Sequence, residues 1–133
     1  MNNFKQKLLV VIGTITTILI FSIANAADPA KGKKVFRKCV ACHSLQECKN
    51  KIGPPLNNLL GRKAGSVEGY KYSKAMATHG KLWSFEEMNG FLIKPKDWIK
   101  GTKMTFVGLK KETERAAVIL YMNNNTDSPL PLK

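Results

Sequence analysis

The pentapeptide Cys39-Val40-Ala41-Cys42-His43 constrains this chain more than any other feature. Two cysteines that are two residues apart and followed at once by a histidine form the C-x-x-C-H pattern of c-type haem attachment. Each thiol can add to a vinyl group of the haem, which leaves neither thiol for a disulfide. We therefore predict one covalently bound haem c, with His43 as a ligand of the iron.

The same pattern could also belong to a redox dithiol or to half of a zinc site. A redox dithiol is typical of a thioredoxin-like fold built from strands and crossover helices, and no strand pattern stands out in this sequence. A zinc site needs two further ligands at a compatible spacing, and Cys48 with His79 gives no recognised arrangement. We interpret Cys48 as a thiol without a role in function.

The first 26 residues have the features of an export signal. Lys5 and Lys7 precede an almost uncharged run over residues 8–23, and Ala24-Asn25-Ala26 matches the A-x-A cleavage pattern. The apolar run is shorter than the ~20 residues that comfortably span a bilayer. We expect cleavage after Ala26, export to the periplasm and a soluble mature chain over residues 27–133. An uncleaved membrane tether is the alternative.

The chain is strongly basic, with 22 Lys and Arg against 9 Asp and Glu and a formal net charge of +13. Removing Lys5 and Lys7 with the signal lowers this charge to +11. Such a charge favours association with an acidic partner. Nucleic acid is not expected, because the chain is exported, carries no nucleic-acid-binding motif and has scattered basic residues.

Capping signals predict several short helices and no strands. An acid before a proline, a serine with a glutamate three residues later, and a threonine are typical helix starts, whereas proline, glycine and asparagine are typical stops. The expected helices begin at Asp28-Pro29, span residues 73–79, run from the Ser84–Glu87 capping box to Pro95, make one turn over residues 95–100 before Gly101, and run from Thr113 to residues 123–125.

Residues 44–66 contain several glycines and prolines with little periodicity, which predicts a long ordered loop. A loop of this length needs a scaffold. A bound haem would supply one, because its apolar ring gives Leu56, Leu59 and Leu60 a surface to pack against.

The second axial ligand decides whether the haem iron carries electrons or reacts. Met76, Met88 and Met122 are expected in the core, where methionine is a common gap filler. Met104 instead lies in an irregular stretch between two predicted helices, where its thioether can be presented to a metal. His79 is the competing ligand, but it precedes Gly80 in a polar turn and is expected to be exposed. A peroxidase-like or gas-binding haem with a labile sixth ligand remains the alternative function.

The order of these features resembles class I cytochromes c, of the mitochondrial type and their bacterial c2-like relatives, over essentially the whole mature chain. The resemblance implies an all-α, small single-domain cytochrome c fold over residues 27–133, with helices and ordered loops wrapped around one covalent haem c. The matching pieces are residues 32–36, 39–43, Gly53-Pro54, residues 61–65, Trp83, residues 89–95 with changes, 101–104 and 113–121.

The resemblance also implies roles for individual residues. His43 and Met104 would be the two iron ligands, and the Pro54 carbonyl would accept a hydrogen bond from the other ring nitrogen of His43. The remaining haem contacts would come from Cys39 and Cys42 through thioethers, from Arg62, Tyr72 and Trp83 at a propionate, from Thr102 in the methionine loop, and from Phe106 over the haem face.

Two positions depart from the family pattern. Phe91 occupies a place where the family commonly has a tyrosine whose hydroxyl bonds to the methionine sulfur, and Met76 occupies the place of a polar amide near the haem. Both departures are expected to change the redox potential, because polarity around the iron ligands tunes it.

The function implied by the resemblance is electron carriage without enzymatic activity. The chain would be a monomeric shuttle in a respiratory chain, accepting single electrons from a quinol-oxidising cytochrome bc complex and passing them to a terminal cytochrome oxidase. Lysines around the haem edge would face acidic docking surfaces on these redox proteins. The matching lysines are Lys38, Lys96, Lys103, Lys110 and Lys111.

Overall fold

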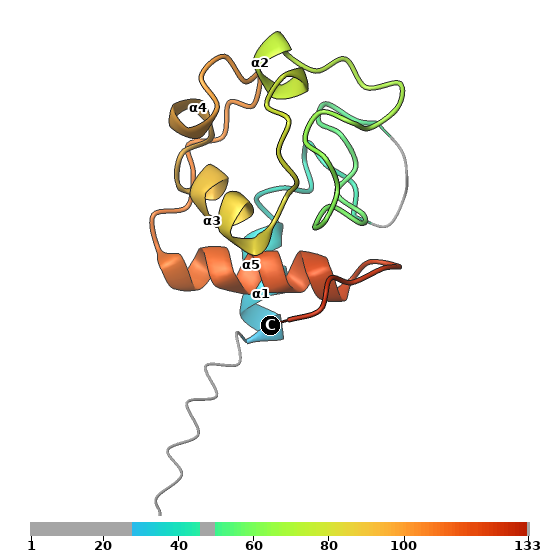
Figure 1. Ribbon diagram of the computed structural model, residues 1–133. Helices are drawn as coiled ribbons and strands as arrows, with labels where there is room; N and C mark the ends of the chain where they lie inside the picture. Colours follow the sequence, from blue (N-terminus) through green and yellow to red (C-terminus); the bar gives the residue numbers. More distant parts are fainter. Residues whose placement is uncertain (1–27, 46–49, 133) are drawn as a thin grey trace, which may run out of the picture.

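The computed structural model describes residues 28–45 and 50–132. The predicted signal and Cys48 lie outside the described residues. Within them the chain forms five helices joined by long irregular segments (Figure 1): α1 (Pro29–Phe36), α2 (Lys74–Ala77), α3 (Phe85–Ile93), α4 (Pro95–Trp98) and α5 (Glu112–Asn124).

The all-α prediction is confirmed for this part of the chain. Its β-type pairing amounts to one isolated antiparallel bridge between Lys63 and Leu82. No helix among the described residues is long and apolar enough to cross a membrane.

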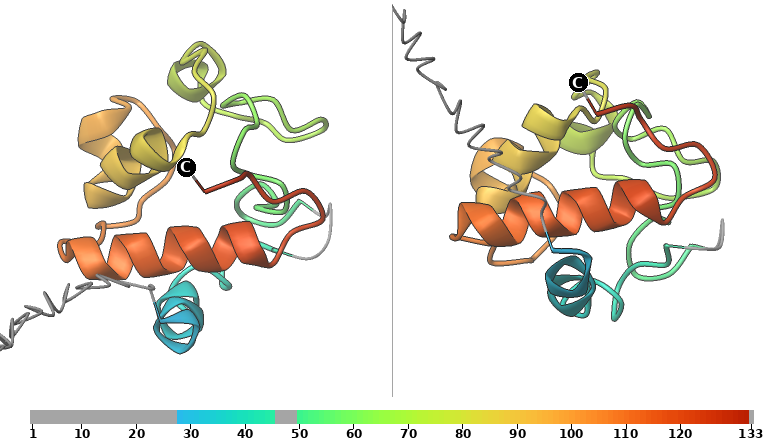
Figure 2. Two further views of the ribbon diagram at one scale, coloured as in Figure 1. Left: turned by 60° about the horizontal axis from the view of Figure 1, so that its bottom comes forward. Right: turned by 90° about the horizontal axis from the view of Figure 1, so that it is seen from below.

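The crossing of α1 and α5 forms one side of the molecule (Figures 1 and 2). Gly32 permits this crossing, because a Cβ at this position would lie 2.4 Å from the Ala117 carbonyl oxygen and 2.6 Å from the Tyr121 Cβ. Phe36 packs against Tyr121 beside it, with ring centroids 5.5 Å apart. The first and last helices of the described residues are thus in direct contact, although most of the described chain lies between them in sequence.

Most of the predicted helix starts agree with the structure. Asp28 accepts a hydrogen bond from Ala30 N, Ser73 from Met76 N and Ser84 from Glu87 N. α3 ends at Ile93 and Pro95 begins α4, because proline disrupts a helix interior but fits the first helical turn. Gly101 adopts the left-handed conformation expected of a terminator, with a φ of 92°.

One predicted cap is wrong, and one capping box is confirmed only in part. The last helix starts at Glu112 with Lys111 at its N-cap and has no side-chain cap, so Thr113 lies inside the helix. The Ser84 hydroxyl caps α3, but the Glu87 carboxylate does not complete a capping box, because it accepts hydrogen bonds from His79, Lys81 and Trp98.

Candidate haem site

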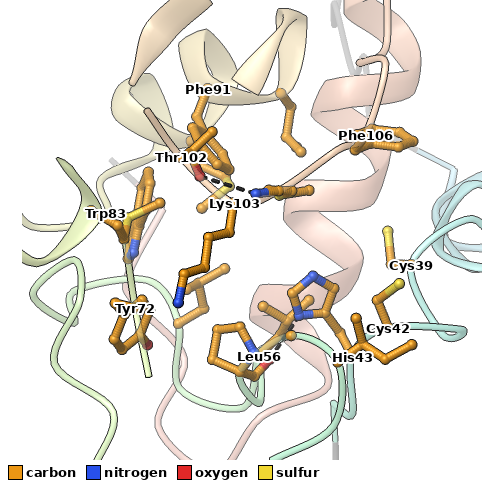
Figure 3. Close-up of a pocket in the computed structure, with 18 of the residues that line it drawn as sticks. Cys39, Cys42, His43, Leu56, Tyr72, Trp83, Phe91, Thr102, Lys103 and Phe106 are labelled. Carbon is orange, nitrogen blue, oxygen red and sulfur yellow. Dashed lines mark hydrogen bonds between the residues drawn. The ribbon is translucent and has the colours of Figure 1, made fainter. Parts of the chain in front are cut away.

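A largely apolar cavity of about 460 Å³ opens between the helices and the long loops. Its size is in the range of cofactor sites, and residues from distant parts of the sequence meet on its wall (Figure 3). The lining side chains that can contact an apolar ring are Leu56, Leu59, Met76, Met88, Phe91, Leu92, Phe106, Val118 and Met122.

The C-x-x-C-H motif forms a tight turn on one wall of this cavity, directly after α1. The backbone nitrogens of Cys42 and His43 both donate to the Cys39 carbonyl, at 3.0 and 2.9 Å. This turn places both cysteines and the histidine on the cavity lining. Burial, and then the neighbouring Cys42, raise the pKa of Cys39 to about 11, while Lys38 lowers it. Cys39 is therefore a protonated thiol in the unmodified chain.

The loop that begins at Gly53 fixes the orientation of His43. The ring Nδ1 donates to the Pro54 carbonyl at 2.7 Å, which leaves Nε2 as the nitrogen with a free lone pair. A Cβ at Gly53 would lie 2.3 Å from the ring Cε1, so only glycine lets the loop close on the imidazole. Burial lowers the pKa of His43, the Pro54 bond opposes this and Lys51 lowers it further. The neutral imidazole that a metal needs is therefore favoured.

Met104 reaches the same cavity from the segment between α4 and α5. Thr102 shapes this segment: its backbone nitrogen donates to the Ile99 carbonyl at 3.0 Å, and its hydroxyl accepts from Met104 N at 3.3 Å. Lys103 donates to the Lys71 carbonyl at 2.9 Å. Figure 3 shows Thr102 and Lys103 across the pocket from Cys42 and His43.

Three residues predicted to contact a haem propionate, Arg62, Tyr72 and Trp83, also lie on the cavity lining. The Arg62 guanidinium donates to the Asn57 and Pro55 carbonyls, at 2.9 and 2.8 Å, which holds it on the loop beneath the cavity. Burial raises the pKa of Tyr72, an effect that outweighs its hydrogen bond to Val67 and the charge of Arg62. The phenol therefore stays protonated and can donate.

His79 does not lie where the sequence predicted. Its side chain is only 14% exposed, and its Nε2 bonds Glu87 Oε1 at 2.6 Å, outside the cavity lining. The polar turn before Gly80 gave no sign of this contact, because Glu87 follows eight residues later on α3. His79 is therefore placed for a contact within the protein, and Met104 is on the lining.

Two methionines of the cavity lining were not predicted as such from the sequence. Met88 and Met122 were predicted to be core residues, and they are buried, but both also line the cavity. Their helical spacing on α3 and α5 indicated an inward direction and could not distinguish protein core from cofactor surface.

Two of the five predicted docking lysines, Lys38 and Lys103, lie on the cavity lining. Lys96 lies on α4, and Lys110 and Lys111 immediately precede α5; all three are exposed. Lys38 also forms an ion pair with Glu114 at 3.5 Å.

An all-α chain that places two cysteines, a histidine and a methionine around one apolar cavity has the architecture of a small c-type haem protein. The Cytochrome c family model matches residues 29–126, so the chain belongs to the cytochrome c family, as a class I protein of the c2 type. Members of this family are electron carriers with one covalently bound haem c.

Individual relatives agree with this assignment. Cytochrome c-550 from Ancylobacter novellus is 49% identical over 98 residues, which cover 71% of this chain and 92% of the relative. Cytochrome c2 from Afifella marina is 42% identical over 106 residues, which cover 77% and 86%. Among solved structures, cytochrome cH from Methylobacterium extorquens has a TM-score of 0.69 at 36% identity, covering 73% of this chain and 98% of that chain.

Proposed function

We propose that this cytochrome carries single electrons with His43 and Met104 as the axial ligands of its haem iron in both oxidation states. The observation that supports this most directly is that Met104 and the C-x-x-C-H turn line one cavity although they lie far apart in the sequence. The haem supplies a one-electron change at its iron when bound. The cavity fits it in size, apolar lining and placement of two thiols and an oriented imidazole.

The residues around the cavity would keep this site rigid. The Pro54 carbonyl and Gly53 hold the His43 ring on one side, and Thr102 holds the Met104 backbone on the other. A site in which neither ligand has to move requires little rearrangement when the iron changes charge, which suits rapid electron transfer. Arg62, Tyr72 and Trp83 would hydrogen-bond a buried propionate, and Phe106 would cover the haem face.

The direction of electron flow follows from the ligands. Methionine ligation raises a haem potential, and burial among apolar side chains disfavours the additional positive charge of the ferric state. We infer that the protein accepts electrons from a quinol-oxidising cytochrome bc complex and donates them to a terminal oxidase. The lysines near the cavity, Lys38 and Lys103, would lie at the docking face, with Lys96, Lys110 and Lys111 extending it.

We also propose that residues 1–26 are removed as a signal peptide and that residues 27–133 act as a soluble monomer in the periplasm. Mass spectrometry of the exported protein tests cleavage and haem attachment together. The expected mass is that of residues 27–133 plus one haem. A mass that retains residues 1–26 would favour a membrane tether.

The optical spectrum tests the proposed ligands. The oxidised protein should be low-spin and should show the weak far-red band that marks methionine–iron ligation in this family. Met104→Ala should abolish the band and open the sixth position, whereas His79→Ala should leave the band in place. A high-spin spectrum in the unmodified protein would instead favour a peroxidase-like or gas-binding haem.

A further inference from the structure

Glu87 has a buried carboxylate on α3, outside the haem cavity, and its side chain is only 10% exposed. Its Oε1 accepts hydrogen bonds from His79 Nε2 and Trp98 Nε1, both at 2.6 Å, and its Oε2 accepts from Lys81 Nζ at 3.2 Å. The donors come from the segment between α2 and α3 and from α4. One carboxylate therefore joins three segments of the chain.

Trp98 is held on α3 by a second contact as well. Its ring lies against Gly90, one turn along the helix from Glu87, where a Cβ would be 2.3 Å from the ring Cη2. The residue is 44% exposed, so Trp98 is not held by burial in the core. The Glu87 hydrogen bond and the Gly90 contact together fix the end of α4 on α3.

The end of α4 leads directly into the segment that carries Met104. Beyond Trp98, the carbonyl of the buried Ile99 accepts a hydrogen bond from Thr102 N, and the Thr102 hydroxyl accepts one from Met104 N. At its far end the same segment returns to α3, where Leu109 N donates to the Leu92 carbonyl at 2.7 Å. α3 thus contacts the Met104 segment at both ends, through side chains at the entry and through a backbone hydrogen bond at the exit.

We propose that Glu87 is a positioning residue for Met104: its carboxylate fixes Trp98 on α3 and so holds the entry of the Met104 segment against the haem. This inference rests on the proposed ligation of the iron by Met104. The exit is also held by Arg115, which donates to the Leu109 and Lys110 carbonyls at 2.9 and 2.8 Å. Arginine keeps its charge in acid, whereas the Glu87 carboxylate does not, so the entry contact makes retention of Met104 sensitive to acid.

The sign of the pH effect follows from the groups around the carboxylate. His79 and Lys81 face it as donors, α4 also brings Asp97, which pairs with Lys94 at 2.8 Å, and α5 presents Arg115 to Asn89 of α3. Burial raises the pKa of Glu87, but the hydrogen bonds from Trp98, His79 and Lys81 together hold it below its ordinary value of 4.5. The contact is therefore complete above that value and is lost as the pH falls through the lowered pKa.

Binding of free imidazole to the ferric holoprotein tests the proposal, because imidazole can bind the iron only when Met104 leaves it. Glu87→Gln should raise the apparent imidazole affinity at neutral pH by about tenfold, the effect expected when hydrogen bonds to a charged group are weakened. Glu86→Gln is the matched control, since Glu86 is the exposed neighbour on the same helix, and it should leave the affinity unchanged.

An acid titration of the far-red band gives the second measurement. Glu87→Gln should lose the band at a higher pH than the unmodified protein, and Glu86→Gln should titrate like the unmodified protein. Trp98→Phe keeps a ring at Gly90 and removes the hydrogen bond, so it should shift imidazole affinity in the same direction as Glu87→Gln. It also serves as the test if Glu87→Gln fails to fold. In the Glu87→Gln background, Trp98→Phe should add little.

A variant that weakens the fold elsewhere separates positioning from general stability. Ile119→Val trims a buried side chain of α5 outside the cavity lining and should leave imidazole affinity unchanged. The inference would be overturned if Ile119→Val and Glu87→Gln shifted the imidazole affinity equally, or if neither Glu87→Gln nor Trp98→Phe shifted it. Either result would leave the proposed ligation by Met104 standing. Absence of the far-red band from the unmodified protein would overturn both this inference and the proposed ligation.

Discussion

Phe91 and Met76 are two apolar residues of the cavity that Met104 also lines. Both side chains are buried on the cavity lining, and the Phe91 ring packs against Trp83 with centroids 5.0 Å apart. Neither carries a group that hydrogen-bonds strongly. Neither side chain can therefore donate a hydrogen bond to the thioether of Met104, the proposed iron ligand.

Phe91→Tyr adds a hydroxyl to this lining. A hydroxyl hydrogen directed at the thioether withdraws electron density from the sulfur, which favours ferrous iron, so we expect the midpoint potential to rise by roughly tens of millivolts. Redox titration of the holoprotein measures the shift. Phe85→Tyr makes the same chemical change on α3 outside the cavity lining and should leave the potential unchanged. Equal potentials for Phe91→Tyr and the unmodified protein would remove this account of the position.

Local sequence predicted some residues of the site well and others poorly. Cys39, Cys42 and His43 lie within five consecutive residues, and a single tight turn suffices to place them on the cavity. The prediction that His79 is exposed was wrong because its surroundings depend on Glu87 and Trp98. Only the packing of α3 and α4 brings these two residues to His79. Short-range patterns carry no information about such a contact.

At the scale of helices too, features set by neighbouring residues were predicted and contacts between distant segments were not. Caps and proline stops predicted α1, α3 and α4, because each depends on residues within one turn. The return of the chain after α5 was not predicted: Leu130 exchanges hydrogen bonds with Asn123, and the Thr126 hydroxyl bonds Asn58 on the long loop. These contacts join residues up to 68 positions apart, and a polar tail sequence gave no sign of them.

Gly32→Ala tests the crossing of α1 and α5. The added methyl group would meet the Ala117 carbonyl, which is backbone and cannot rotate away, so the helices must separate. We expect the free energy of unfolding to fall by about 2–3 kcal/mol, measured from the denaturant midpoint of the holoprotein. Lys33→Ala, on the exposed face of α1, should change it by less than about 0.5 kcal/mol. Similar midpoints for the two variants would show that the crossing tolerates a side chain.

The molecule as a whole is defined by an apolar cavity within a strongly basic surface. The formal charge of +13, or +11 without the signal, exceeds what solubility requires of a small domain. A carrier must bind and leave its partners quickly, and long-range attraction raises the association rate without requiring a tight complex. The charge is thus suited to fast, transient docking, and its location decides which face docks.

Electron transfer from this protein to an oxidase with an acidic docking face should be strongly salt-dependent. The Debye length shortens from about 30 Å at 0.01 M to about 3 Å at 1 M, so stopped-flow measurements over this range should show the second-order rate constant falling by about tenfold or more. A flat salt profile would contradict a lysine-based docking surface.

Two lysine variants locate the docking face by the same measurement. Lys38→Gln removes a half-exposed charge on the cavity lining, and Lys63→Gln removes one at the Lys63–Leu82 bridge, outside the lining. The change in net charge is identical, so any difference between the variants reports position. Lys38→Gln should slow electron transfer at low salt more than Lys63→Gln, and the two rates should converge at high salt because screening removes the attraction. Equal slowing by both would mean that total charge, rather than the face around the cavity, governs association.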